Sequence, residues 1–300
     1  MFEEHLKWSR LRIDTYLGDV IEEWAAAEQV PERLLMAMRH AVLGGGKRFR
    51  PFLVRASAEL FGADADQAMP IAAAVELVHC YSLVHDDLPA MDNDRVRRGQ
   101  PTVWAAFDEW TAILAGDALL TLAFEVLSSL GSSAAPALRV LLMRELARSA
   151  GGGGMVGGQA LDLAADKLGE PRQHSVIHVR RLQAMKTGAL ITYSCRAGAL
   201  LAGALAEDVE RMTRFGSALG LAFQISDDLL DATGNAVEAG KAVGKDAEQG
   251  KATILSLLGV EGARAELEAA QIAAIAALER YGRKAEALRS AVEYLAARKS

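Results

Sequence analysis

The sequence contains few of the residues that mark secreted proteins or β-sheet proteins. Only two of its 300 residues are cysteine, Cys80 and Cys195, and aromatic residues make up 6% of the chain. Two cysteines so far apart indicate buried thiols in a reduced protein, although spacing alone leaves a disulfide open. Alternation of apolar and polar residues with a period of two is nearly absent, which argues against a half-buried β-sheet.

Basic charge and long apolar runs are also scarce. The net charge is −6 and no DNA- or RNA-binding signature is present, which argues against a general nucleic-acid binder. The most apolar stretch, residues 112–130, contains Asp117 and Glu125, so we predict that it does not span a membrane. The first residues, MFEEH, lack the basic-then-apolar order of a secretion signal. These absences predict a cytoplasmic protein.

What the sequence has instead is a high content of helix-forming residues. Ala, Leu, Glu and Arg dominate, and proline or glycine stands where helices can begin or end, as at Pro31, Pro70 and Gly44–Gly46. No interior Pro- or Ser-rich linker is present, so we predict a single all-α domain over residues 1–300. The predicted helices cover residues 31–43, 51–61, 71–87, 104–108, 111–130, 135–150, 172–206, 209–231, 249–258 and 263 to the C-terminus.

A glycine-rich run at residues 151–158 contains a formal G-x-G-x-x-G match. Dinucleotide-binding motifs of this form follow a β-strand, and none is predicted here. We therefore interpret the run as a helix break or a close contact between helices.

Two clusters of aspartate carry the strongest chemical signal. They comprise Asp86, Asp87 and Asp92, and then Asp227, Asp228 and Asp231. In a helix, Asp227 and Asp231 lie one turn apart on one face, where like charges repel, so stability alone would not select them. Pro89 interrupts the first cluster and would let Asp92 turn back towards Asp86. Grouped carboxylates beside apolar helices suit a hard cation such as Mg²⁺, and an acidic surface patch is the alternative.

Basic residues could balance these carboxylates through bound phosphate groups. The segment GGKRFRP at residues 45–51 places three cations, Lys47, Arg48 and Arg50, on a glycine turn at a helix start, which favours an anion site. His79 lies two helical turns before Asp86 and so on the same face. Further polar or basic candidates near the two clusters in the sequence are Arg97, Arg98, Lys186, Thr187, Lys241, Lys245 and Lys251.

The order of these motifs resembles the farnesyl diphosphate synthase family over nearly the whole chain. The matching strings are GGGKRFRP (44–51), LVHCYSLVHDDLPAMDNDRVRRGQPT (77–102), AILAGDALL (112–120), GGQALDL (157–163), MKTG (185–188), FQISDDLLD (223–231) and GKAVGKD (240–246). The four-residue gap between Asp87 and Asp92 is similar to that of the bacterial short-chain enzymes. The sequence departs from a frequent pattern at Arg95–Val96, where an acidic residue and Leu are common, and at Val103–Trp104, where a His often stands.

The resemblance implies a bundle of antiparallel helices around a deep central cavity, in a homodimer with no nucleic-acid partner. It implies a transferase that joins isopentenyl diphosphate to dimethylallyl and geranyl diphosphate by ionisation, condensation and elimination. It assigns three Mg²⁺ ions, replaceable by Mn²⁺, to Asp86, Asp87, Asp92, Asp227, Asp228 and Asp231. It assigns the allylic diphosphate to Arg97, Lys186, Thr187, Gln224 and Lys241, with the last four as catalytic residues, and isopentenyl diphosphate to Lys47, Arg50, His79 and Arg98.

The resemblance implies that residues just before the first cluster set the product length. Tyr81, five residues before Asp86, resembles the aromatic residue that closes the chain pocket in the farnesyl type, and Ser82 lies on the Asp86 face of the helix. A geranylgeranyl diphosphate synthase is therefore the nearest alternative. A terpene cyclase typically has a mixed Asn/Ser/Glu second cluster, and a non-catalytic helical partner subunit should have lost some of the charged residues. The intact aspartate and basic sets argue against both.

Overall fold

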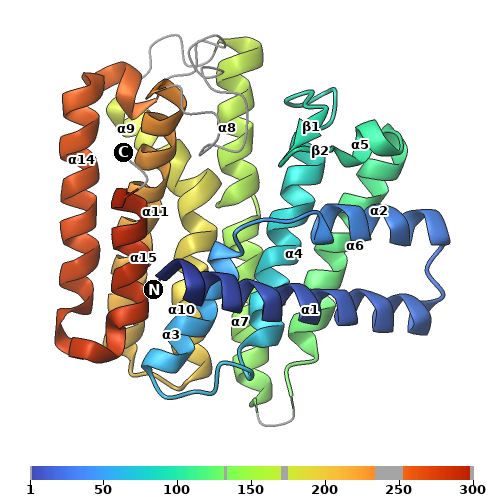
Figure 1. The fold of residues 1–300 in the computed structure, drawn as a ribbon, viewed down its shortest axis with the longest axis horizontal. Helices are drawn as coiled ribbons and strands as arrows, with labels where there is room; N and C mark the ends of the chain where they lie inside the picture. Colours follow the sequence, from blue (N-terminus) through green and yellow to red (C-terminus); the bar gives the residue numbers. More distant parts are fainter. Residues whose placement is uncertain (1, 132–133, 170–174, 234–252, 298–300) are drawn as a thin grey trace. The chain divides into compact units, whose positions relative to one another are not determined.

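The computed structural model describes residues 2–131, 134–169, 175–233 and 253–297, and most of them are helical (Figure 1). The predicted all-α class is confirmed. The strands in this part of the chain are two short ones, β1 (Val96–Arg97) and β2 (Gln100–Pro101), which pair antiparallel with Val96 opposite Pro101.

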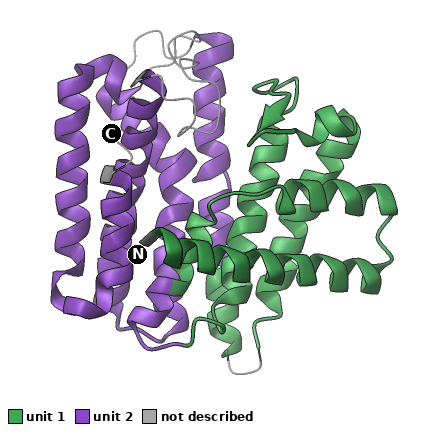
Figure 2. Ribbon diagram, in the orientation of Figure 1, with its two compact units in different colours: residues 1, 3–55, 64–143 green, residues 2, 56–63, 144–300 purple. Residues whose placement is uncertain are grey.

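The chain divides into two compact units, which Figure 2 colours separately. Unit 1 comprises mainly residues 3–55 and 64–143, and unit 2 mainly residues 56–63 and 144–300. The division falls inside two helices, α3 (Phe49–Leu60) and α7 (Pro136–Ala150). The single domain over residues 1–300 remains a prediction.

Unit 1 is built around α4 (Met69–Asp86), which is buried along most of its length. Its other helices are α1 (Phe2–Glu28), α2 (Glu32–Leu43), α5 (Val103–Ala106) and α6 (Glu109–Ser128), together with the first parts of α3 and α7. α6 packs along α4, and this contact requires Gly116, because a Cβ there would overlap the ring of His85. His85 Nε2 lies 3.0 Å from the carbonyl oxygen of Ile113 and so connects the two helices.

Burial in unit 1 also explains the apolar composition of α6. Among the described helices, it is the one long and apolar enough to cross a membrane by length and composition. However, 50% of its most apolar window is buried, and the helix packs against α4 and α2. A buried core helix needs the same composition, so this feature is weak evidence for a membrane span.

Unit 2 is built around α11 (Ala206–Thr233), which packs against α10 (Ala189–Leu201) and α14 (Ile254–Leu278). The unit also contains α8 (Met155–Leu168), α9 (Val176–Gln183), the π-helical turn η1 (Ala184–Gly188), the 3₁₀ segment η2 (Glu279–Ala285) and α15 (Glu286–Ala297). α10 and α11 approach closely at glycine: a Cβ on Gly216 would lie 2.7 Å from the Cα of Thr192, and one on Gly220 2.9 Å from the Cα of Gly188. These contacts fix η1 and α10 against α11.

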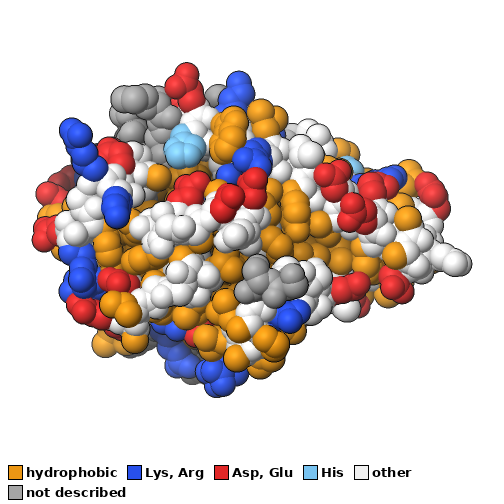
Figure 3. All heavy atoms as spheres, turned by 90° about the horizontal axis from the view of Figure 1, so that it is seen from below, with side chains coloured by type: hydrophobic (Ala, Val, Ile, Leu, Met, Phe, Trp, Pro, Cys, Tyr) orange, Lys and Arg blue, Asp and Glu red, His pale blue; other side chains and the backbone are white. Residues whose placement is uncertain are grey.

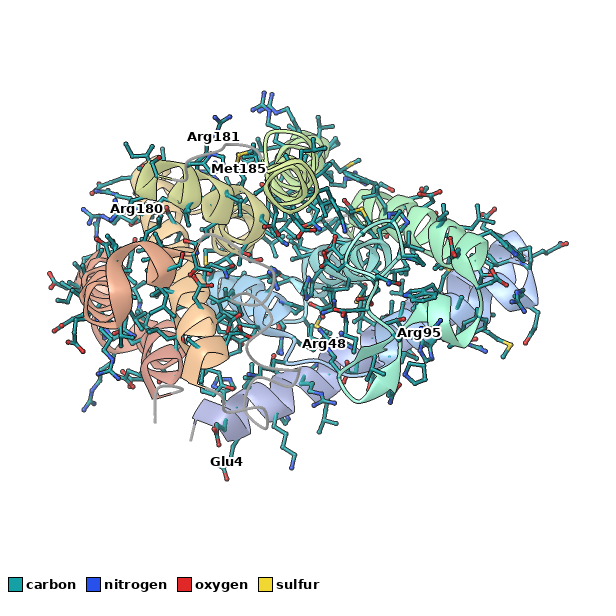
Figure 4. The ribbon with its side chains drawn as sticks, turned by 90° about the horizontal axis from the view of Figure 1, so that it is seen from above. Glu4, Arg48, Arg95, Arg180, Arg181 and Met185 are labelled. Carbon is teal, nitrogen blue, oxygen red and sulfur yellow. The ribbon has the colours of Figure 1, made fainter. Side chains whose placement is uncertain are left out.

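The glycine-rich run ends one helix and begins the next, as interpreted from the sequence. α7 ends at Ala150, and Gly154 is the N-terminal cap of α8. Inside α8, a Cβ on Gly157 would lie 2.7 Å from the terminal methyl of Met185, and one on Gly158 would overlap the backbone of Lys186. The glycines therefore let α8 approach η1 closely. Met185 lies beside α8 in Figure 4.

Both cysteines are free and buried, Cys80 in unit 1 and Cys195 in unit 2, which confirms the predicted buried thiols. Burial raises the pKa of each thiol to about 12, so neither is a reactive thiolate near neutral pH. On the face drawn in Figure 3, acidic and basic side chains are both scattered among hydrophobic ones.

Candidate active site

The first aspartate cluster forms where α4 ends. Asp86 is the last residue of the helix and Asp87 its C-terminal cap. The loop containing Pro89 then turns back, because the backbone N–H of Asp92 donates a hydrogen bond of 2.9 Å to the carbonyl oxygen of Asp86. Proline cannot donate the backbone hydrogen bond that would continue the helix, which explains the break. The structure thus places Asp92 beside Asp86, as predicted.

Asp87 is the buried member of this cluster, at 3% exposure. Arg97 of β1 donates to its carboxylate through Nη2, at 2.6 Å, and Nε, at 2.8 and 3.1 Å. Burial raises the pKa of Asp87, Arg97 offsets part of that rise, and the nearby carboxylates of Asp94 and Asp92 raise it further. Several carboxylates thus lie close enough to repel one another, an arrangement that a bound cation would relieve.

The glycine turn before α3 lies beside Arg98, the residue after Arg97. Gly45 and Gly46 have φ angles of 99° and 136°, which other residues rarely adopt. Arg98 donates a hydrogen bond to the carbonyl oxygen of Gly45, and a Cβ on Gly46 would lie 2.6 Å from Nη1 of Arg98. Glycine is therefore required for Arg98 to join the turn that carries Lys47 and Arg50.

Arg48 does not belong to this anion site, so the prediction of three available cations on the turn is wrong. Its side chain is fully buried, with Nε 2.6 Å from Asp14 Oδ1 and Nη1 2.7 Å from Glu76 Oε1 (Arg48 is labelled in Figure 4). It also donates to the carbonyl oxygen of Val42. Burial alone would lower the pKa of Arg48, but the carboxylates raise it above its usual value. Its φ of 50° turns the side chain inward, so Arg48 holds the turn in place.

His79 lies among the arginines of this region. Its pKa falls well below 6.5, first because of burial and then because of the charges of Arg50, Arg98 and Arg97. The imidazole is therefore neutral near pH 7, and can donate one hydrogen bond and accept another. Unit 1 thus brings together Arg50, His79 and Arg98, three of the four residues assigned to isopentenyl diphosphate, beside the turn that carries Lys47.

The second cluster lies in unit 2, inside the continuous helix α11. Asp228 and Asp231 are both 5% exposed, and Asp227 is partly exposed. Asp228 accepts hydrogen bonds of 3.0 Å from the side-chain amides of Gln183 and Gln224. The carbonyl oxygen of the Gln224 amide in turn accepts 2.9 Å from the hydroxyl of Thr187. Thr187, Gln224 and Asp228, which the sequence assigned to one site, thus form one hydrogen-bonded row.

Lys186 stands next to Thr187 in the π-helical turn η1. Turns of this kind are rare and often occur at functional sites, since the wider backbone reorients side chains. The Nζ atom of Lys186 lies 2.6 Å from Asp162 Oδ2 of α8. Lys186 is therefore held by a carboxylate inside unit 2. Lys241, Lys245 and Lys251 lie outside the described residues.

The carboxylates fit magnesium sites that a substrate completes. In the described part of the chain, no group of three His, Cys, Asp or Glu side chains forms a ready metal site. Mg²⁺ is usually bound by one or two protein carboxylates together with waters and phosphate oxygens. The all-oxygen donors of both clusters suit that mode and do not suit a closed structural site for a softer metal.

Tyr81 and Ser82 occupy different environments on α4. Tyr81 is 6% exposed and packs edge-to-face on His85, with ring centroids 5.8 Å apart. Burial and the charge of Asp86 raise the pKa of Tyr81 to about 12, so its phenol is neutral near pH 7. The hydroxyl of Ser82 donates 2.8 Å to the carbonyl oxygen of His79. The assignment of both residues to product length remains a prediction.

Two positions at which the sequence departs from the frequent pattern contact each other. The guanidinium carbon of Arg95 lies 4.7 Å from the ring centroid of Trp104, a cation–π contact. The indole N–H of Trp104 donates 2.7 Å to the carbonyl oxygen of Asp94. Arg95 (Figure 4) and Trp104 therefore form a pair that supports the loop after the first cluster.

Comparison with known proteins places the chain in a family. The model of the polyprenyl synthetase family matches residues 31–295. The farnesyl diphosphate synthase of Geobacillus stearothermophilus is 41% identical, covering 90% of each chain. Geranylgeranyl pyrophosphate synthase 9, chloroplastic, of Arabidopsis thaliana is 42% identical over 78% of this chain and 65% of that protein. An apo crystal structure described as an FPP/GFPP synthase from Zymomonas mobilis is 42% identical, with a TM-score of 0.81, and covers 96% of this chain and 99% of that one.

The chain belongs to the polyprenyl synthetase family. The resemblance drawn from the sequence is confirmed.

Two residues of the site escaped the sequence analysis. Gln183, which holds Asp228, and Asp162, which holds Lys186, were not assigned roles. Asp162 lies in the string GGQALDL, so its position in a matching motif was the available signal. Gln183 lies outside every quoted string and carries no such signal.

Proposed function

We propose that this chain is a metal-dependent farnesyl diphosphate synthase, which condenses isopentenyl diphosphate with dimethylallyl and then geranyl diphosphate. The observation that carries the proposal is that the neighbouring residues Arg97 and Arg98 bind different partners. Arg97 binds the carboxylate of Asp87, whereas Arg98 binds the glycine turn that carries Lys47 and Arg50. One anion site has carboxylates for metal ions and the other groups Lys47, Arg50 and Arg98, an arrangement that suits two diphosphate substrates.

The carboxylates of both clusters would hold the metal ions. We assign Asp86, Asp87 and Asp92 in unit 1, and Asp227, Asp228 and Asp231 in unit 2, to three Mg²⁺ ions. When bound, the ions stabilise negative charge on the leaving diphosphate. Gln183 and Gln224 each donate a hydrogen bond to one oxygen of the Asp228 carboxylate, and so orient it for metal binding.

The chain's own residues then act on the substrates. Lys186, Arg97 and Lys241 bind the allylic diphosphate and stabilise the charge that develops as the C–O bond breaks. Thr187 and Gln224, which are hydrogen-bonded to each other, contact the same diphosphate. Lys47, Arg50, His79 and Arg98 hold isopentenyl diphosphate, whose double bond attacks that fragment. The departing diphosphate, which carries the negative charge left by the broken C–O bond, then accepts the proton that the condensed product loses.

The assembly and the product are also proposals. We infer one polyprenyl synthase domain, because α3 and α7 each contribute residues to both units and the family model spans both. We further propose a cytoplasmic homodimer. Farnesyl diphosphate is favoured as the product because the buried ring of Tyr81 lies one and a half helical turns before Asp86, where it can stop a growing chain.

Product analysis tests this function directly. Purified protein is incubated with isopentenyl diphosphate and either dimethylallyl or geranyl diphosphate, with and without Mg²⁺, and the products are separated by chromatography. We expect farnesyl diphosphate from both primers, no product in excess chelator, and recovery on adding Mg²⁺. Full turnover in chelator would contradict the metal assignment.

The alternative, a geranylgeranyl diphosphate synthase, is tested at Tyr81. Tyr81→Ala and Tyr81→Met remove the ring, so we expect longer products while the metal requirement is unchanged. Tyr81→Phe is the matched control, because it removes the hydroxyl but keeps the buried ring. A wild-type protein that already makes geranylgeranyl diphosphate would establish the alternative, and an unchanged product in folded Tyr81 variants would exclude Tyr81 as the stop.

A further inference from the structure

Unit 2 contains a large groove that the proposed reaction does not use. Its volume is about 940 Å³, within the range of small-molecule sites. Its lining comes from α7, α9, η1, α10, α11 and α14, and its charged residues are Glu145, Arg148, Arg180, Arg196, Arg211 and Arg214. Five guanidinium groups and one carboxylate line it, so the groove favours an anion.

Three of these arginines are held by carboxylates. Arg180 pairs with Glu266 of α14, Arg196 binds Glu145 at 2.7 and 3.1 Å, and Arg211 lies 2.8 Å from Glu207. Within the described ranges, no ion pair involves Arg148 of α7 or Arg214 of α11, and both are exposed. The buried Nε of Arg211 likewise has no hydrogen-bond acceptor there. The groove thus has donors in excess of its own acceptors.

The floor of the groove is apolar and made of small residues. Gly188 of η1, Ala189 of α10, Ala218 and Leu221 of α11, and three alanines of α14 contribute to the lining. Thr192 and Ser217 add hydroxyls. Small side chains leave the width that a flat or linear apolar group needs, and arginines bind phosphate groups through paired hydrogen bonds.

The groove shares the π-helical turn η1 with two residues that would bind the allylic diphosphate. Ala184 and Gly188 of η1 line it, whereas Lys186 and Thr187 of the same turn bind Asp162 and Gln224. Leu221 of α11 lines it one turn before Gln224. An occupant would therefore contact the same π-helical turn that carries Lys186 and Thr187.

We propose that this groove is a second ligand site of the protein, which binds an organic diphosphate with its head among Arg148, Arg214 and Arg211 and its apolar chain on the alanine-lined floor. Prenyl diphosphates and free inorganic diphosphate share the diphosphate group that the arginines would bind. Only a prenyl diphosphate also has the apolar chain. The choice of a prenyl diphosphate rests on the proposed function, whereas the anion site itself does not. Binding needs no metal ion, because the groove offers cations and not grouped carboxylates.

Calorimetric titration in excess chelator tests the site apart from catalysis. The protein carries Lys47→Ala and Arg50→Ala, so that binding at the glycine turn is reduced, and the probes are farnesyl diphosphate and inorganic diphosphate. We expect about one equivalent bound per chain. Adding Arg148→Ala and Arg214→Ala should weaken binding of both probes about tenfold to a hundredfold. Adding Arg181→Ala and Arg264→Ala instead removes two exposed charges of unit 2 that do not line the groove, and should change nothing.

A variant with a larger side chain in the apolar part of the groove distinguishes a prenyl diphosphate from inorganic diphosphate. Ala276→Phe narrows the apolar floor but leaves every arginine. If the prenyl chain occupies the floor, this variant weakens farnesyl diphosphate about tenfold and leaves inorganic diphosphate unchanged. If the variant changes the affinity for neither probe, only the diphosphate group binds in the groove. That result would overturn the placement of a prenyl chain on the floor. The site is overturned if the Arg148 and Arg214 variant binds both probes as its parent does, or if the Arg181 and Arg264 control loses as much. Product formation by the wild type is scored separately, so failure of the proposed function is distinguishable.

Discussion

The two aspartate clusters hold their buried carboxylates in different ways. In unit 1, Asp87 lies at a helix end and is bound by the guanidinium of Arg97. In unit 2, Asp228 lies inside a helix and is bound by the neutral amides of Gln183 and Gln224. A guanidinium neutralises the carboxylate, whereas amides orient it and leave its charge in place. In the first cluster, a metal ion would therefore compete with Arg97 for the carboxylate of Asp87. In the second cluster, the carboxylate of Asp228 is already oriented and keeps its negative charge for a metal ion.

Removing either carboxylate charge should have the largest effect. Asp87→Asn and Asp228→Asn each delete a proposed metal ligand, so we expect turnover to fall by about a thousandfold or more while the fold survives. The comparison predicts a further difference in metal dependence. Arg97→Gln removes the guanidinium that competes with a cation for Asp87. At saturating allylic substrate, which Arg97 is also proposed to bind, the variant should lower the Mg²⁺ concentration needed for half-maximal rate. Gln224→Leu removes an orienting amide and should raise it. Mg²⁺ titrations of steady-state rate measure both, and equal shifts in the two variants would contradict the distinction.

The buried contacts of Arg48 should matter most for stability. Arg48→Met leaves the carboxylate of Glu76 buried without its guanidinium, so we expect a loss of about 3–5 kcal/mol in the free energy of unfolding. Arg48→Met combined with Glu76→Met removes both charges and should recover much of that loss. Denaturant titrations of the three proteins measure this, and a double variant less stable than Arg48→Met would show that the pair is not the cause.

The glycine turn distinguishes the two diphosphate sites kinetically. Lys47→Ala and Arg50→Ala each remove one charge-assisted contact, about 1.5–3 kcal/mol, so the KM for isopentenyl diphosphate should rise about ten- to a hundredfold. The KM for the allylic substrate should change little, because we assign its binding to the aspartate clusters and their metal ions. Initial-rate measurements with each substrate varied in turn decide this. An equal or larger rise for the allylic substrate would reverse the assignment.

The sequence predicted the features that depend on neighbouring residues, such as turns and the bounds of helices. Pro89 indicated that Asp92 turns back, and the hydrogen bond between Asp92 and Asp86 confirms this. Helix patterns gave α2, α4, α6 and α7 within a few residues. The helix α8 was not assigned because Gly157 and Gly158 discouraged it, although tertiary contact with Met185 and Lys186 is what requires them.

Properties that depend on distant residues could not be predicted. Arg48 looks like Lys47 and Arg50 in the sequence, and only the buried partners Asp14 and Glu76 reveal its different role. No residue pattern distinguishes the π-helical turn at Lys186 from an α-helix, so the sequence predicted one continuous helix there. The cation–π pair of Arg95 and Trp104 joins two departures from the frequent pattern that looked unrelated in the sequence.

The smallest expected effect concerns His79, and it tests whether the cation cluster of unit 1 is as concentrated as its geometry indicates. Burial and then Arg50, Arg98 and Arg97 lower the pKa of His79 below 6.5 in the folded state. The unfolded chain then binds more protons than the folded one at low pH, so this histidine's contribution to stability is present above about pH 6.5 and is lost as the pH falls below it. Wild type should therefore lose stability on acidification more steeply than His79→Gln, by at most about 1.4 kcal/mol per pH unit. NMR titration of the imidazole resonances gives the pKa itself, and Arg50→Ala should raise it. A His79 pKa at or above 6.5 in the wild type, or one that ignores Arg50→Ala, would show that these arginines do not surround it.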